Sequence, residues 1–387
     1  MSIYRGCSRV FLAMSFALLA FLTGCGGTGD EVGNGSAGNG SGGNSGPPPD
    51  TTVPTVTAMT PGEDSFGLAI NSKLTATLSE AMDPALINTA NFRLAEGDNA
   101  IPGTVSYDST NHIAVFTPTS SFAPNTRFTA TIVTGIKDLG NNPLTTDFAW
   151  CFSTGGSADS TPPSVISKIP ASAGTGVAVN RRITATFSEE MNSSTLTAAS
   201  FAVTGPGPTP VSGTVTYSGR TAVFTPSPSL APNTTYTATI GTGATDLAGN
   251  ALQANTWSFT TGASADVTAP VALSTSPAGS GVPIGSTINV TLNEPMDPAT
   301  LNTANFAVTG PGATLVIGTV AFAFDATHTT ATFTRIKHLT TFVEPHPTPV
   351  SRLDPSTTYT AAITTGATDL AGNALANNRV WSFTTAP

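Results

Sequence analysis

The amino-acid sequence predicts an all-β protein in which three tandem antiparallel β-sandwich domains follow a signal peptide and a disordered linker. Only 10% of the 387 residues are charged and 7% are aromatic, whereas 38 are Gly and 30 are Pro. This composition disfavours amphipathic helices and suits short strands joined by turns. Apolar residues also alternate with polar ones along many segments, which is the period of a strand. Finally, one pattern of residues occurs three times, and a prior of one domain per about 100–200 residues allows two to four domains.

Residues 1–24 have the features of a bacterial lipoprotein signal peptide. Arg5 and Arg9 give a positive start, and the uncharged run Val10–Leu22 follows. The run is shorter than the about 20 residues that span a bilayer as a helix. Leu22-Thr23-Gly24 precedes Cys25 and resembles the lipobox, which implies cleavage before Cys25 and attachment of diacylglycerol to its thiol. The alternative is an ordinary cleaved signal followed by an incidental cysteine.

A lipidated N-terminus indicates where the protein is located. A terminus with two or more acyl chains is stably anchored, so we expect the membrane to be a partner. The residue after Cys25 is Gly26 rather than Asp. By resemblance to Gram-negative lipoproteins, this implies the bacterial cell envelope, at the outer membrane or the cell surface. The net charge of −9 argues against a nucleic-acid partner, because few cations are present to neutralise phosphates.

Residues 25–50 are expected to be the lipidated cysteine and a disordered tether. The tether is rich in Gly, Ser and Asn and ends at Pro47-Pro48-Pro49. Such a segment has almost no apolar surface to bury, so it should stay disordered. A Gly-rich coil of about 25 residues spans roughly 28 Å root mean square, from about 5–6 Å times the square root of its length. We expect it to separate the folded domains from the bilayer.

The remainder of the chain contains one sequence unit in three copies. We divide it into domains at residues 51–155, 156–262 and 263–387. Each unit carries a Glu-x-Met segment, then a Phe, then a closing Trp-x-Phe pair. In chain order these are Glu80-Ala81-Met82, Phe92 and Trp150-Cys151-Phe152; Glu189-Glu190-Met191, Phe201 and Trp257-Ser258-Phe259; and Glu294-Pro295-Met296, Phe306 and Trp381-Ser382-Phe383. Units of about 100 residues are domains rather than solenoid repeats of about 20–50 residues.

Within each unit, the segments between turns have the pattern of strands. Apolar residues alternate with Thr or Asn in matching segments of the three units, Leu74–Leu78, Ile183–Phe187 and Ile288–Leu292. One face of such a strand is expected in the core and the largely Thr face in water. About seven short strands with turn signals between them, in about 100 residues, predict an antiparallel Ig-like sandwich. A closed barrel is the structural alternative.

Recurring Asp and Asn residues are expected mainly to support the fold. One set would cap short helices and consists of Asp83-Pro84, Asn192-Ser193 and Asp297-Pro298. A second set would form tight turns and consists of Asp138–Asn142, Asp246–Asn250 and Asp369–Asn373. In these turns Asn141, Gly249 and Gly372 should be left-handed. The alternative is cation binding, because carboxylate and amide oxygens are ligands that Ca²⁺ prefers.

Pro-containing turns precede an aromatic residue in the next strand. Ala123–Thr126 leads to Phe128, and Ala231–Thr234 leads to Tyr236. This arrangement resembles the tyrosine corner of Ig folds.

The repeated motifs resemble a known family. The Asp-x-Ala-Gly-Asn turn, the Glu-x-Met-Asp/Asn segment and the closing Trp-Ser-Phe-Thr-Thr strand are similar to those of the bacterial Ig-like domain of the SbsA type. That family is common as tandem modules in S-layer and other cell-surface proteins. The resemblance covers residues 51–387 and implies an extracellular spacer or adhesive module without catalytic residues. The first unit departs from the pattern at Asn141 and Cys151.

The two short linkers between units, residues 155–160 and 262–267, each contain one Asp, at Asp159 and Asp266. Acidic linkers between sandwich domains can bind Ca²⁺ and stiffen the chain, as in cadherins. A plain solvated linker is the alternative, because one Asp per junction is few for about six to eight oxygen ligands. Apart from this possible Ca²⁺, no cofactor is expected.

The third unit contains an insertion near residues 335–352 that the other two lack. Its charged and His residues are Arg335, Lys337, His338, Glu344, His346 and Arg352. Because loops on a rigid sandwich commonly carry recognition, the alternative function is a surface lipoprotein that binds a glycan or a protein through this loop. The other interpretations are a decorative insertion and a zinc site at His338, Glu344 and His346.

No catalytic site is expected. The four His residues occupy positions that do not repeat, and no Ser or Cys lies in a nucleophile-elbow context. Cys151 remains after removal of the signal and lipidation of Cys25; we expect it to be partly covered, with pairing between chains as the alternative. The expected function is therefore that of a lipid-anchored, non-catalytic stalk, spacer or adhesive module.

Overall fold

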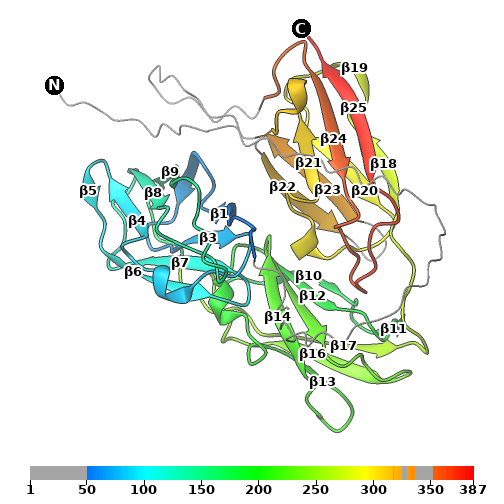
Figure 1. The fold of residues 1–387 in the computed structure, drawn as a ribbon. Coiled ribbons are helices and arrows are strands. Elements are labelled where there is room, and N and C mark those ends of the chain that lie inside the picture. Colours follow the sequence, from blue (N-terminus) through cyan, green and yellow to red (C-terminus); the bar gives the residue numbers. More distant parts are fainter. Residues whose placement is uncertain (1–49, 317, 325–328, 336–351) are drawn as a thin grey trace, which may run out of the picture.

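The computed structural model describes residues 50–316, 318–324, 329–335 and 352–387. Over these residues the chain forms β-strands and four short 3-10 helices and has no α-helix. The strands form six sheets, two in each domain (Figure 1). The prediction of an all-β protein with three tandem sandwiches is confirmed.

Two separate sheets make up the first domain. One has the order β1-β3-β7-β6, formed by β1 (Val56–Thr60), β3 (Leu74–Leu78), β7 (Ile113–Pro118) and β6 (Gly103–Asp108). The other has the order β2-β9-β8-β4-β5, formed by β2 (Ser65–Leu68), β9 (Phe148–Thr154), β8 (Arg127–Ile132), β4 (Phe92–Glu96) and β5 (Asn99–Ala100). Because the sheets share no strand, the domain is a sandwich rather than a closed barrel.

The other two domains repeat this topology without a counterpart of β5. In the second, the sheets are β10 (Val165–Ile169), β12 (Ile183–Phe187), β15 (Thr221–Pro226) and β14 (Gly213–Ser218), and β11 (Gly174–Val177), β17 (Asn255–Thr261), β16 (Thr235–Ile240) and β13 (Phe201–Thr204). In the third, they are β18 (Ala272–Ser276), β20 (Ile288–Leu292), β23 (Thr329–Arg335) and β22 (Gly318–Phe324), and β19 (Gly279–Val282), β25 (Arg379–Thr385), β24 (Thr358–Ile363) and β21 (Phe306–Thr309). The 3-10 helices are η1 (Pro84–Leu86), η2 (Ser193–Thr195), η3 (Pro298–Thr300) and η4 (Pro311–Ala313).

One edge pair in each domain differs from the fully antiparallel arrangement that the sequence predicts. The short strands β2, β11 and β19 run parallel to β9, β17 and β25. After its first strand the chain crosses to the other sheet, so the next strand runs beside the last one in the same direction. These four-residue, Gly-containing strands have no apolar alternation that would reveal them.

Each domain has a hydrophobic core of its own. In β3 the inward residues Leu74 and Ala76 are fully buried, as the alternation predicts. In the second domain the ring of Phe201 lies 5.9 Å from that of Phe224 and 6.0 Å from that of Trp257. The three buried clusters draw on residues of one domain each. Each sandwich can therefore be stabilised by its own apolar burial.

A glycine begins the edge strand β14 because an aromatic ring lies against its backbone. A Cβ on Gly213 would lie 2.6 Å from the Phe224 ring and 2.6 Å from the carbonyl oxygen of Thr225. Gly103 and Gly318 meet Phe116 and Phe333 in the same way. Any side chain at these positions would have to displace backbone, so the edge strand depends on Gly.

The tyrosine corner is present where the sequence has Tyr. The Tyr236 hydroxyl accepts a hydrogen bond from the Ala231 N–H at 2.8 Å, and the Tyr359 hydroxyl accepts one from the Asp354 N–H at 2.9 Å. Phe128 occupies the corresponding position of the first domain without a hydroxyl. There, as in the other domains, a Thr of the last strand braces the turn: Thr154 donates to the Ala123 carbonyl at 2.7 Å.

Two of the three helix caps form as expected. Asp83 accepts a hydrogen bond from the Ala85 N–H at 2.9 Å, and Asp297 accepts one from the Ala299 N–H at 3.1 Å. The prediction that Asn192 caps η2 in the same way is wrong, because its side chain makes no such bond. Its Oδ1 instead accepts the hydroxyl of Ser194 at 2.8 Å. A side-chain hydroxyl close in sequence has replaced the backbone donor.

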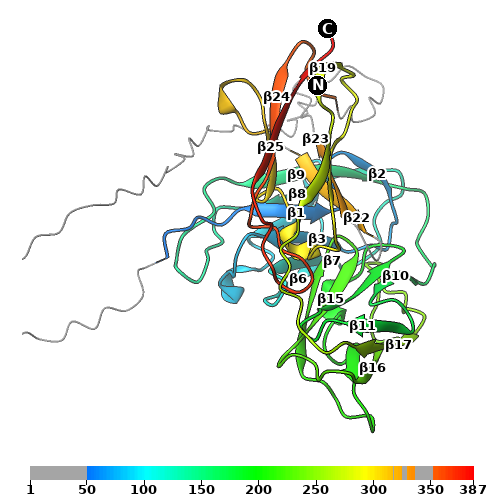
Figure 2. The ribbon, with the colours of Figure 1, turned by 90° about the vertical axis from the view of Figure 1, so that its right-hand side faces the viewer.

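The three sandwiches do not form a straight rod. The first and third domains both lie on the upper side of the second, so the chain bends at the central domain (Figure 1). The view turned by 90° shows the same relation (Figure 2). The arrangement of the domains therefore depends on the two junctions that flank the central domain.

Replacing Tyr236 with Phe should lower the free energy of unfolding of the second domain by about 1 kcal/mol, because the N–H of Ala231 would lose its hydrogen-bond partner in the fold. Urea unfolding followed by the fluorescence of Trp257 would measure this change. The reciprocal variant Phe128→Tyr adds the hydroxyl to the first domain and provides the matched comparison. An unchanged stability of Tyr236→Phe would show that the corner contributes nothing to the fold.

Candidate functional site

Three carboxylates meet at the same end of each domain. One comes from the segment before the first strand, one follows the third strand of the unit, and one lies in the tight turn that precedes the last strand. The clusters are Asp50/Glu80/Asp138, Asp159/Glu189/Asp246 and Asp266/Glu294/Asp369, and in each the carboxylate oxygens lie within 4.8 Å of one another. The second and third clusters lie at the junctions between domains.

The turn aspartate of each cluster is fixed by the turn itself. Asp246 is buried, and its carboxylate accepts hydrogen bonds from the Asn250 N–H and from Asn250 Nδ2, both at 2.8 Å. Gly249 has φ of 95°, which allows the chain to reverse between them. The same bonds join Asp138 to Asn142 and Asp369 to Asn373. The predicted tight turns are therefore confirmed.

The linker aspartate is oriented by the domain that precedes it. Asn71 Nδ2 donates to the Asp159 carbonyl at 2.9 Å, and Asn71 Oδ1 accepts from the Asp159 N–H at 2.8 Å. Asn180 makes the same pair of bonds with Asp266. From the following domain, Asn250 Nδ2 approaches the Asp159 carbonyl at 3.4 Å. Each linker is thus fixed by both of its neighbours.

A main-chain hydrogen bond connects the domains at both junctions. The Lys73 N–H donates to the Leu247 carbonyl at 3.0 Å, and the Arg182 N–H donates to the Leu370 carbonyl at 2.8 Å. These contacts cover the two leucines, which are 7% and 0% exposed. Leu139, at the matching position of the first domain, is 72% exposed. The two junctions therefore use the same interface.

Burial and like charge make the glutamate of each cluster a weak acid. The pKa of Glu189 is raised to about 7, mainly by burial and then by repulsion from Asp159 and Asp246. The pKa of Glu294 is also raised to about 7, and that of Glu80 is raised, for the same reasons in their own clusters. Each cluster holds excess negative charge that a proton or a cation would relieve.

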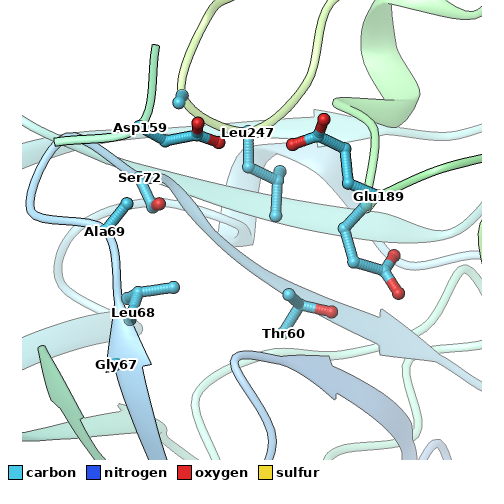
Figure 3. A pocket seen from close by; sticks show the side chains of 10 residues that line it. Thr60, Gly67, Leu68, Ala69, Ser72, Asp159, Glu189 and Leu247 are labelled. Carbon is cyan, nitrogen blue, oxygen red and sulfur yellow. The ribbon is translucent and has the colours of Figure 1, made fainter. Parts of the chain in front are cut away.

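A cavity of about 360 Å³ opens beside the cluster at the first junction. Its lining includes Ser72, Asp159, Glu189 and Leu247, which come from both domains and the linker. The carboxylates of Asp159 and Glu189 lie on either side of Leu247 (Figure 3). Asp159 and Glu189 line the cavity, and together with the buried Asp246 they form a set of oxygen ligands that suits a hard cation such as Ca²⁺.

At the second junction a cavity of about 760 Å³ occupies the corresponding place. It is lined by Asp266 and Glu294 from the cluster and by Arg181 from the preceding domain. Next to it, the guanidinium of Arg182 forms an ion pair with Asp297 across the junction. The two junctions therefore share their main-chain contacts and differ in their charged side chains.

The linker residues Asp159 and Asp266 lie at the junctions, each close to two further carboxylates. The sequence suggests one Asp per junction, and the structure adds a Glu and a second Asp from the following domain. These two come from motifs that the sequence assigns to the scaffold. The Glu of the Glu-x-Met segment and the Asp of the tight turn recur in all three units, and in each unit the Glu lies at a similar sequence distance from an Asp that precedes the first strand. This shared spacing is the sequence signal that could have revealed the cluster.

The other site residues of the sequence analysis fall at the edge of the described chain or beyond it. Arg335 forms an ion pair with Asp354 at 2.9 Å and donates to the Tyr359 hydroxyl at 3.2 Å, so it supports the base of the insertion. Arg352 is exposed, and its carbonyl accepts from Arg335 at 3.1 Å. Four residues of the loop, Lys337, His338, Glu344 and His346, lie outside the described residues, as does the lipidation residue Cys25.

Cys151 is more deeply buried than the sequence suggests. It is 2% exposed and its Sγ lies 3.4 Å from the Thr129 hydroxyl, on the neighbouring strand β8. The expectation of a partly covered thiol is therefore wrong. Pairing between chains would require the first domain to open.

The fold and the junctions define a tandem array of Ig-like sandwiches. A family model described as "Bacterial Ig-like domain" matches residues 50–154, 159–261 and 266–385. The chain belongs to this family of bacterial Ig-like domains. No curated protein sequence is similar enough to count as a relative.

Several solved structures are similar at low identity. The S-layer protein rSbsC(31-844) is 11% identical with a TM-score of 0.24, over 86% of this chain and 54% of that chain. The chicken CNTN1 FN1-FN3 domains are 13% identical with a TM-score of 0.18, over 87% of this chain and 99% of that chain. This chain thus spans about half the length of the S-layer protein. At these TM-scores the similarities carry no functional argument.

Within the part of the chain that the structure describes, no helix has the length and apolar character needed to cross a membrane.

In the presence of a chelator, the protein should become less stable as the pH rises from about 5 to about 8. Glutamate in an unfolded chain has a pKa near 4.5, whereas Glu189 and Glu294 have values of about 7 in the fold. Between these values the folded state binds more protons than the unfolded state, so the free energy of unfolding falls as pH rises. Melting temperatures across this range would measure the effect.

The variant Glu189→Gln/Glu294→Gln should flatten this pH dependence. Glu96→Gln, at an exposed position of β4, is the matched control and should leave it unchanged. An unaltered slope in the double variant would contradict the assignment of the pH dependence to the clusters.

Proposed function

We propose that this protein is a lipid-anchored component of the bacterial cell envelope whose sandwich domains act as a non-catalytic stalk, spacer or adhesive module. The observation that carries the proposal is that each domain has a complete core of its own, while neighbouring domains meet through a few polar contacts. Such an array spaces its domains along the chain without building an enclosed active site. The signal sequence, Cys25 and the Gly-rich tether support anchoring at the N-terminal end.

The chemistry of the junction cavities supports a non-catalytic role. Both cavities are lined by carboxylates with small and aliphatic residues, and the second also by Arg181 and Asn293. Neither lining contains His or Cys that could act as a general base or a thiol nucleophile. Recognition of a glycan or a protein by the insertion of the third domain stays a prediction.

We further propose that the acidic clusters bind a divalent cation such as Ca²⁺, which stiffens the chain. The cluster at the first junction joins Asp159 of the linker to Glu189 and Asp246 of the following domain. A cation there would bridge the linker and the domain and would relieve the repulsion that raises the pKa of Glu189. Three carboxylates supply about half of the six to eight oxygens that Ca²⁺ takes, and water would supply the rest.

Treatment of intact cells with a protease should remove the three domains if they face outward. The lipid would remain with the membrane fraction, because cleavage is expected within the Gly-rich segment between Cys25 and the first domain. An antibody against the third domain, applied to membranes and supernatant, would measure this. Cys25→Ser is the control for anchoring and should release the protein from the membrane fraction.

Protection of the domains in intact cells, with cleavage after permeabilisation, would place them on the periplasmic side. Membrane retention of Cys25→Ser would contradict lipid anchoring.

Adding Ca²⁺ to chelator-treated protein at pH 8 should raise the melting temperature and the protease resistance of the linkers. At ten times the dissociation constant, one site would add about 1.4 kcal/mol to the free energy of unfolding. Glu189→Gln/Glu294→Gln should lose most of this gain, and Glu96→Gln should keep it. If Ca²⁺ changes neither quantity in the unaltered protein, the cation proposal is wrong.

A further inference from the structure

The two junctions provide an internal comparison, because the same interface carries different side chains. The residues immediately before the matching strands β3 and β12 are Ser72-Lys73 in the first domain and Arg181-Arg182 in the second. Both pairs lie at the contact with the following domain, since the N–H of Lys73 and the N–H of Arg182 make the main-chain bond across their junctions. Differences at these positions therefore act directly on the junction.

At the second junction, Arg182 makes an ionic contact between domains. Its guanidinium pairs with Asp297 of the third domain, which also caps η3 through the Ala299 N–H. The Asp297 side chain is 9% exposed and that of Arg182 is 26% exposed. Burial raises the pKa of Asp297, and the neighbouring Arg182 opposes this rise. A pair this sheltered is screened less by salt than a surface pair.

Arg181 supplies a second positive charge at the same junction. It lines the cavity that Asp266 and Glu294 also line. Burial lowers the pKa of Arg181, and attraction to Asp369, Asp266 and Glu294 opposes this shift. A guanidinium keeps its charge at neutral pH, so this cluster has a counter-ion built into the chain.

The first junction lacks both ionic features. Ser72 is 6% exposed and lines the cavity beside Asp159 and Glu189 in the place that Arg181 takes at the second junction. Neutral Asn192 stands at the position of Asp297, so Lys73 cannot form the corresponding ion pair. The links that cross this junction are hydrogen bonds, including that from the Tyr217 N–H to Asn111 Oδ1 at 2.8 Å.

We infer that Arg181 and Arg182 form an ionic lock that fixes the third domain on the second, and that the hinge of the chain lies between the first and second domains. The second and third domains then move as one body relative to the first. This inference goes beyond the proposed function and does not depend on membrane anchoring or on a bound cation.

The experiment measures the spread of distances across each junction in a chain that begins at residue 26. Spin labels on cysteines at the exposed positions Ser120, Ser229 and Asn377 report on the three domains, and Cys151 is too buried to be labelled. Pulsed electron paramagnetic resonance in a chelating buffer gives the distance distribution for each pair of spin labels. We expect the pair in the second and third domains to give the narrower distribution.

Removing the charged residues of the second junction, and introducing them at the first, tests whether these residues cause the difference in width. Arg181→Ser/Arg182→Gln should broaden the distribution between the second and third domains to the width seen across the first junction. Ser72→Arg/Lys73→Arg/Asn192→Asp should narrow the distribution across the first junction. The cavity beside Ser72 provides space for the arginine that this variant introduces. Arg93→Ser removes an exposed charge whose side chain bonds within its own domain, to the Ala90 carbonyl, and should change neither width.

Equal widths across the two junctions of the unaltered protein would overturn the inference, as would an unchanged second junction in Arg181→Ser/Arg182→Gln. The fluorescence of Trp150, Trp257 and Trp381 reports whether each domain keeps its core in a variant. If Ser72→Arg/Lys73→Arg/Asn192→Asp fails to fold, the variant that replaces both Arg181 and Arg182 decides alone. Arg181→Lys is its charge-conserving control and should keep the narrow distance distribution. None of these outcomes bears on where the protein lies in the envelope, which the protease experiment measures separately.

Discussion

The buried aspartate of the tight turn organises the end of each sandwich. In the central domain, the Asp246 carboxylate accepts two hydrogen bonds from Asn250, and its own N–H bonds to the Asn250 carbonyl at 3.1 Å. Asp246 also pairs with Met191 in an isolated bridge, which places the Glu-x-Met segment beside the turn. Asn250 in turn reaches the linker at Asp159. One buried carboxylate therefore positions the turn, the neighbouring segment and the approach of the preceding domain.

This arrangement has an electrostatic cost that explains the chemistry of the junctions. A buried carboxylate is tolerated when it is hydrogen-bonded, and Asp246 is. Burial raises the pKa of Glu189, and the convergence of Glu189 and Asp159 on Asp246 adds repulsion that raises it further. A proton, a metal cation or an arginine can each relieve this repulsion. Support of the fold and the proposed binding of a cation therefore involve the same residues and are not alternatives.

One hydrogen bond occurs in all three domains although the residue that accepts it differs. The N–H of Met82 donates to the Tyr107 hydroxyl at 3.0 Å, and that of Met191 donates to the Tyr217 hydroxyl at 2.9 Å. In the third domain Phe322 replaces this Tyr, and the Met296 N–H bonds to the Thr329 hydroxyl instead, at 2.9 Å. The requirement is a hydroxyl acceptor for a buried N–H, and two different positions of the sandwich can supply it.

Local sequence patterns predicted the strands and turns of this fold, but they did not predict contacts between residues that are far apart in the chain. Alternation in Leu74–Leu78 and the turn signals are properties of neighbouring residues, so the sandwiches, the turns and two caps were predictable. The parallel edge strand Ser65–Leu68 and the close approach of Gly213 to Phe224 depend on which strands meet, which periodicity does not encode. The acidic cluster was missed for the same reason, because Asp159 and Asp246 are far apart in the chain. Asn192 differs because a nearby Ser194 competes for its side chain.

The parallel edge pairs have a mechanical consequence. In the central domain the chain enters at β10, crosses to β11 and leaves at the end of β17. The strands β11 and β17 pair in parallel, with Gly174 beside Phe259 and Val177 beside Thr261. A pull on the two ends of the domain draws the paired strands in opposite directions along their length. The bonds between them then share the load instead of separating one at a time. A domain built this way resists extension along the chain, as the proposed stalk role would require.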